Sequence, residues 1–124
     1  MKNITLGFSF FFTLLSFGQV STNKAHDAIV EEFLTNCAEK HNYNIEMSEW
    51  QSCLDQGLEK DSTVAHLWQQ KAMPYFKCKK YEVGMQYLDK AVLYDKKEWL
   101  PYRGFMKCIF SKNYKDAITD LEEC

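Results

Sequence analysis

The sequence contains few of the residues that interrupt regular secondary structure. Only two prolines and five glycines occur among its 124 residues. The glycines are scattered along the chain, so none of the glycine-rich loops that cradle phosphates is present. Alternation of apolar and polar residues never continues long enough to indicate a β-strand. These absences disfavour a nucleotide-binding or sheet-rich fold and favour helices.

An excess of positive charge is also lacking, because the formal net charge of the chain is −2. Domains that bind nucleic acid normally carry a basic excess. The one basic cluster, formed by Lys77, Lys79 and Lys80, is expected to be a turn between two helices. We therefore expect no nucleic-acid partner.

The five cysteines form no C-x-x-C pair, so the usual redox and zinc-binding motifs are missing. They are Cys37, Cys53, Cys78, Cys108 and Cys124. Their number is odd, so one or two disulfides are compatible with the sequence and at least one thiol is unpaired or joins another chain.

Cys37 and His41 have a spacing that suits two metal ligands, but no further ligand is evident. His26 and His66 are isolated and expected to face solvent. Nucleophilic catalysis by a cysteine needs a histidine and an orienting group close to it, and nothing local in the sequence resembles that arrangement. We therefore expect no enzyme, no metal and no cofactor.

The N-terminus has the pattern of a secretory signal peptide. Lys2 gives a short positive start, an apolar run covers residues 4–17, and Ser16 and Gly18 are small residues at the positions that a signal peptidase reads. The run is shorter than the roughly 20 residues that a membrane-spanning helix needs. We expect cleavage before Gln19 and an exported protein, periplasmic or secreted, that meets the membrane only during export. An uncleaved anchor or a buried N-terminal helix is the alternative.

The remainder of the chain has the periodicity of amphipathic helices. Apolar residues recur at spacings of three and four within residues 30–41, 64–75 and 81–92. Ser48 and Gln51 predict a capping box at the start of a further helix. We divide the chain into a signal peptide over residues 1–18, a short linker over 19–26 and a helical repeat domain over 27–124.

The chain aligns with itself when it is shifted by about 34 residues, a period typical of stacked helix pairs. Residues of the same kind are aligned by this shift: Leu54 with Leu88, Leu58 with Val92 and Asp61 with Asp95. A further shift of nearly the same length places Tyr81 on Tyr114, Gly84 on Ala117 and Leu88 on Leu121. The two alignments together predict that a unit of two helices occurs three times. Such units are expected to stack, because each can bury its apolar faces only against its neighbours.

The second unit has Trp68, Ala72 and Tyr75 in its first expected helix and Gly84, Leu88 and Ala91 in its second. With these residues it resembles the tetratricopeptide repeat (TPR), whose helices read W-x-x-L-G-x-x-Y and A-x-x-x-F. It differs from that pattern at Lys71, where leucine is expected, and at Pro74, which lies inside the first helix. The resemblance implies an all-α fold of about three antiparallel helix pairs, stacked as a short TPR-like solenoid. It also implies a structural core of Trp68, Ala72, Tyr75, Tyr81, Gly84, Leu88, Tyr114, Ala117 and Leu121.

The first helices of TPR pairs line a concave surface that holds peptides. By that resemblance, a groove for a protein or peptide partner is lined by His66, Gln69, Met73, Phe76 and Lys77, and by Tyr102 and Met106, with Trp99 and Phe110 on the same helix. Helix packing that covers these side chains is the alternative. Two classes of function follow: an exported scaffold that binds a partner segment, or a structural module that assembles with copies of itself or forms the N-terminal part of a larger envelope complex.

Overall fold

The computed structural model describes residues 24–110 and 114–122, except for the side chains of residues 114 and 115. Helices contain 82% of the described residues and none of these residues forms a strand, which confirms the expected all-α fold class. No helix in this part of the chain is long and apolar enough to cross a membrane. The expected signal peptide and its cleavage site lie outside the described residues.

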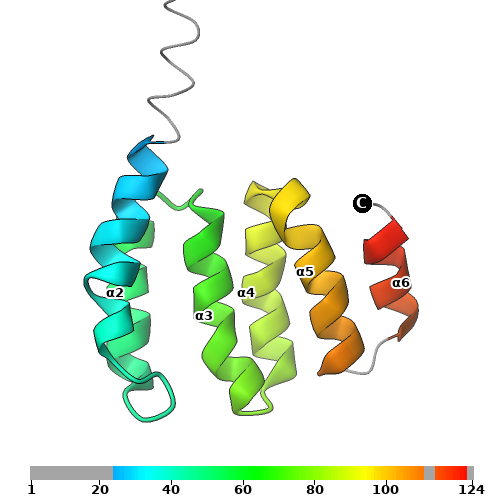
Figure 1. Ribbon diagram of the computed structural model, residues 1–124. Helices are drawn as coiled ribbons and strands as arrows, with labels where there is room; N and C mark the ends of the chain where they lie inside the picture. The colour runs from blue at the N-terminus through cyan, green and yellow to red at the C-terminus, as the bar shows by residue number, and fades with distance from the viewer. Residues whose placement is uncertain (1–23, 111–113, 123–124) are drawn as a thin grey trace, which may run out of the picture.

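The helices follow one another in chain order across the molecule. The N-terminal segment, residues 24–40, is α-helical at residues 24–30, π-helical in η1 (Glu31–Thr35) and 3₁₀-helical in η2 (Ala38–Lys40). The later helices are α2 (Met47–Lys60), α3 (Ala65–Lys77), α4 (Tyr81–Tyr94), α5 (Lys96–Ile109) and α6 (Tyr114–Glu122). Figure 1 shows them side by side in alternating directions, with the N-terminal segment against α2 at one end and α6 at the other. Packing is closest between α3 and α4 and between α5 and α6.

The helix boundaries follow the repeat found in the sequence. Helices α2 and α4 each have 14 residues, and their first residues, Met47 and Tyr81, are superimposed by the same shift that aligns the chain with itself. Helix α6 begins at Tyr114, the residue that the second shift aligns with Tyr81. Leu54 and Leu88, which the first shift aligns, are both fully buried. The chain therefore places equivalent residues at equivalent depths in α2 and α4.

The expected capping box at the start of α2 is wrong. The helix begins at Met47, with Glu46 at the N-cap position and no capping hydrogen bond from its side chain. The Gln51 side-chain amide instead donates to the Lys71 carbonyl oxygen at 3.0 Å. Gln51 therefore links α2 to α3, and this tertiary contact takes the place of the local one that the sequence motif predicts.

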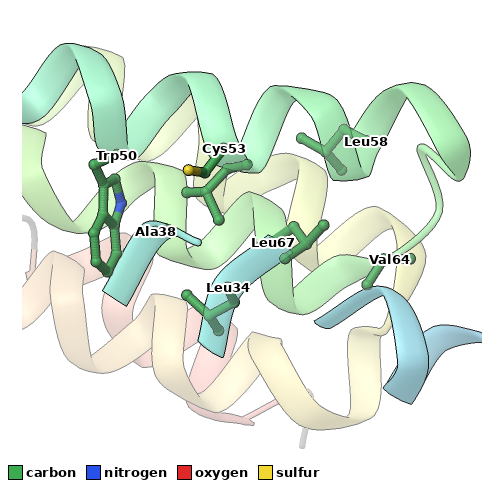
Figure 2. Close-up of a cluster of buried hydrophobic side chains, with 8 residues drawn as sticks. Leu34, Ala38, Trp50, Cys53, Leu58, Val64 and Leu67 are labelled. Atoms are coloured by element: carbon green, nitrogen blue, oxygen red, sulfur yellow. The ribbon is translucent and has the colours of Figure 1, made fainter. Parts of the chain in front are cut away.

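The first hydrophobic core lies between the N-terminal segment, α2 and the start of α3. Figure 2 shows its buried side chains, which include Leu34, Trp50, Leu58 and Leu67. A disulfide between Cys37 and Cys53 joins the N-terminal segment to α2 beside this core. Cys78 and Cys108 are free thiols in the described part of the chain.

The second core lies between α3, α4 and α5. Phe76 is its largest buried side chain, and Leu88, Ala91 and Met106 belong to the same buried cluster. Gly84 allows this packing, because a β-carbon at that position would come within 3.0 Å of the Phe76 ring. Close approach of α3 and α4 therefore depends on the small residue in α4 and the large one in α3.

Candidate functional site

The residues expected to line a groove lie along the seam between α3 and α5. The His66 and Trp99 rings are tilted against each other with centroids 5.7 Å apart. Further along the seam, the Tyr102 hydroxyl donates to the Met73 sulfur at 2.9 Å. The sequence analysis therefore identified two helix faces that meet, but over much of their length they cover each other.

The prediction that the groove is lined by Phe76, Met106 and Gln69 is wrong, because all three side chains are buried. Phe76 and Met106 are each 2% exposed, and Gln69 is 5% exposed. A partner cannot reach side chains at that depth, so these residues belong to the packed interior. Phe76 is buried because α3 has helices on both apolar faces: Gly84 of α4 admits its ring, and its ring also contacts that of Phe110. Lys77, the last residue of α3, is exposed.

The residues expected in the structural core occupy several environments. Ala72, Gly84, Leu88 and Ala117 are buried, whereas Trp68, Tyr75 and Tyr81 are half-buried. Leu121 is 48% exposed, although its side chain covers Gly104 of α5. The Tyr114 side chain lies outside the described residues.

Trp68 packs against both hydrophobic cores and so connects them. Its indole N–H donates to the Ser62 carbonyl oxygen at 2.7 Å, and its ring stacks on Tyr87 with centroids 6.1 Å apart. The polar edge of the indole is therefore satisfied at the surface while its apolar body faces inward, as is usual for this side chain.

An open cleft of about 690 Å³ lies where the seam between α3 and α5 reaches the N-terminal segment. The N-terminal segment contributes His26 and Asp27, the start of α3 contributes His66, and the start of α5 contributes Glu98 and Trp99. Tyr94, the last residue of α4, and the turns before α3 and α5 complete the walls. We call this feature the end cleft. It is the place where the N-terminal segment, α3 and α5 together present side chains to an open space.

Carboxylates dominate the charge of the end cleft. Asp27, Asp95 and Glu98 line it, and its lining includes no lysine or arginine among the described residues. Burial lowers the pKa of His66, and the negative charges of Glu39 and Glu98 oppose that effect only in part. His66 is therefore neutral near pH 7, and the cleft is negatively charged.

The wall formed by the N-terminal segment is fixed through His26. Its Nε2 atom lies 3.1 Å from the Asp61 carboxylate in the turn between α2 and α3. Hydrogen bonds from the Thr63 hydroxyl and backbone N–H are the main cause of the lowered pKa of Asp61, and His26 adds to them. Asp61 therefore remains ionised and orders both the turn and the adjacent segment. His26 is half-buried in this contact, whereas the sequence analysis expected it to face solvent.

Sequence reasoning identified His66 and Trp99 but missed the carboxylates around them. The alignment of Asp61 with Asp95 could have indicated one of these carboxylates. Each aspartate directly follows a 14-residue helix and lies in the turn that leads to the next helix. Each accepts a backbone N–H, from Thr63 in one case and from Glu98 in the other. Their shared position shows that the turns on this edge of the molecule recur with the repeat.

Metal coordination is not supported at any cluster in the described ranges. No group of three or more histidine, cysteine, aspartate or glutamate side chains there is arranged to hold an ion. Cys37, which has the right spacing from His41 for a metal pair, is instead bonded to Cys53.

Comparison of the chain with protein-family models, curated proteins and solved structures gave no significant match, so the end cleft is interpreted from its own residues.

Proposed function

We propose that this chain is an exported scaffold protein that holds a segment of a partner protein, with helix pairs stacked as in a TPR array. The first helices of the three pairs are the N-terminal segment, α3 and α5, and the second helices are α2, α4 and α6. One observation carries the proposal: the end cleft is walled by residues from all three first helices. In a TPR array these are the helices that line the concave, partner-binding surface.

Two observations support export. The apolar run over residues 4–17 with small residues at its end has the form of a signal peptide. The Cys37–Cys53 disulfide belongs to an oxidising compartment, because cytosolic reductants keep most thiols reduced. N-terminal mass spectrometry of material from the cell envelope or medium should give Gln19 as the first residue, whereas an intact Met1 in that material would contradict cleavage.

Site-specific crosslinking tests the binding role. A photo-crosslinking aromatic residue in place of Trp99 should capture a discrete partner in the cell envelope, with the crosslinked peptide mapping to one contiguous segment. The same residue in place of Gln86, which is exposed on α4, is the control. Equal capture from both positions, or none from Trp99, would contradict a binding surface at the end cleft.

Self-assembly is the second candidate, because α5 and α6 expose apolar side chains. Phe105, Ile109, Ile118 and Leu121 are each about half exposed. Exposed apolar patches often mark contacts between proteins. Sedimentation of the chain over a range of concentrations discriminates the two candidates: a mass that rises with concentration and falls in an Ile118→Glu variant supports assembly, and a constant monomer mass excludes it.

A further inference from the structure

The carboxylates that line the end cleft have no direct basic partner in the described part of the protein. In the ranges that the structure describes, no lysine or arginine forms an ion pair with Asp27, Asp95 or Glu98. Asp27 and Glu98 are exposed, and one oxygen of Asp95 accepts the Glu98 backbone N–H at 3.2 Å. Like charges that line a concave surface raise the local concentration of ligands of opposite sign.

Aromatic side chains stand beside these carboxylates. Trp99 and Tyr94 both line the end cleft. The Trp99 ring is held in place by two contacts, since it is tilted against His66 and meets the Tyr102 ring edge-on at a centroid separation of 5.6 Å. Among side chains, an indole face is the strongest site for a cation–π contact.

These features together define the chemistry of a ligand. An anionic ligand would face three carboxylates, with no lysine or arginine among the described residues of the lining. A bound metal ion lacks the arrangement of ligands it needs among the described residues. An arginine or lysine side chain fits both features, because its charged head pairs with carboxylates while its aliphatic stem and its charge pack on an aromatic ring.

We propose that the end cleft binds a basic segment of a partner protein and receives an arginine or lysine side chain between Trp99 and the carboxylates of Asp27 and Glu98. This inference rests on the proposed scaffold function and adds the chemical class of the bound segment. Arginine is the better fit of the two, since its planar guanidinium both stacks on an indole and donates to a carboxylate through two N–H groups.

Binding of labelled peptides tests the inference. The probes are a glycine–serine peptide carrying several arginines and matched peptides carrying lysines, glutamates or neither, and fluorescence anisotropy measures their binding. The test variant is Asp27→Asn with Glu98→Gln, which removes two charges with little change in shape. Asp95 is left intact because it caps α5. The matched control is Glu49→Gln with Glu82→Gln, which removes two exposed carboxylates outside the cleft, one in α2 and one in α4.

The arginine peptide should bind best, and the test variant should weaken its binding about fivefold or more, a modest change because exposed ion pairs are individually weak. Trp99→Leu should also weaken binding, and the Glu49→Gln, Glu82→Gln control should not. Equal weakening by the control variant would show that binding follows net charge alone, and no weakening in the test variant would show that Asp27 and Glu98 do not contact the peptide. Either result would overturn the inference. Preferential binding of the uncharged or acidic peptide, lost in Trp99→Leu, would overturn the basic specificity but leave the scaffold function standing. Binding of no peptide overturns the inference, and the crosslinking experiment then decides the scaffold function separately.

Discussion

Lys71 is nearly buried although it carries an ammonium group, and only 5% of its surface is exposed. Its Nζ atom forms an ion pair with Asp55 of α2 and lies 4.9 Å from the centre of the Tyr87 ring of α4. A single residue of α3 therefore makes polar contacts with both neighbouring helices. This accounts for lysine at a position where the TPR pattern has leucine.

Removing the partner of this charge should destabilise the protein. We expect Asp55→Ala to lower the free energy of unfolding by about 1–2 kcal/mol, less than for a fully buried pair because the Asp55 side chain is 57% exposed. Adding Lys71→Met should restore most of the loss, since an apolar side chain of similar length needs no counter-charge. Urea denaturation of both variants is the measurement, and a double variant less stable than Asp55→Ala would contradict this account.

The turn between α3 and α4 contains a residue in the left-handed region, since Lys79 has φ of 61°. The N–H groups of Lys79 and Lys80 donate to the carbonyl oxygens of Phe76 and Tyr75, which ends α3 in a Schellman motif. A side chain in this conformation costs about 1–2 kcal/mol, and glycine avoids most of that cost. Lys79→Gly should therefore raise the melting temperature, whereas Lys79→Ala, which keeps the β-carbon, should leave it unchanged.

At the level of helices, α5 and α6 are joined by ion pairs to a buried carboxylate. The Asp120 carboxylate of α6 accepts hydrogen bonds from Arg103 of α5 at 2.8 and 3.0 Å and lies 2.7 Å from the Lys107 ammonium. Arg103 also reaches Asp89 of α4. Burial alone would raise the pKa of Asp120, but its bonds to Arg103 and Lys107 outweigh that effect and hold the pKa below its ordinary value.

The packing of α6 should consequently depend on acid pH. Because the pKa of Asp120 is lower in the folded protein than its unfolded value near 3.8, its contribution to stability is complete above that value and is lost as the pH falls through the folded pKa. Asp120→Asn should remove the contribution at neutral pH, at a cost of about 2–3 kcal/mol. Hydrogen exchange of α6 from pH 6 to pH 3 measures the effect, with Glu122→Gln as the exposed control; an acid response that persists in Asp120→Asn would point to another group.

Most helices were predictable because their apolar residues recur with helical spacing and their turns fall between the recurring sets. The N-terminal segment was less predictable, since the disulfide at Cys37 coincides with a break between π-helical and 3₁₀-helical turns. The error at Phe76 has a simple physical origin. Sequence spacing shows that α3 has two apolar faces, but it does not show that α4 and α5 cover both of them. The end cleft could be predicted only in part, because its carboxylates come from two segments far apart in the sequence, Asp27 in one and Asp95 and Glu98 in the other.

Across the whole molecule, each helix packs mainly on its chain neighbours, and two cores meet at Trp68. Such an arrangement makes stability a sum of local terms, so one end can loosen while the other stays folded. The only covalent link between non-adjacent residues of the described chain is the Cys37–Cys53 disulfide, and it holds the N-terminal segment, which also forms a wall of the end cleft.

Replacing this disulfide should therefore act on the N-terminal end alone. In the chain-entropy description, a link across 16 residues stabilises the folded state by about 3 kcal/mol. We expect Cys37→Ser with Cys53→Ala to lower the free energy of unfolding by that order and to increase hydrogen exchange in residues 24–60, while α5 and α6 keep their protection. Cys78→Ser, which changes an exposed free thiol, should leave both measurements unchanged. A uniform loss of protection along the chain would mean that the helices unfold as one cooperative unit, and the end cleft would then depend on the stability of the whole molecule.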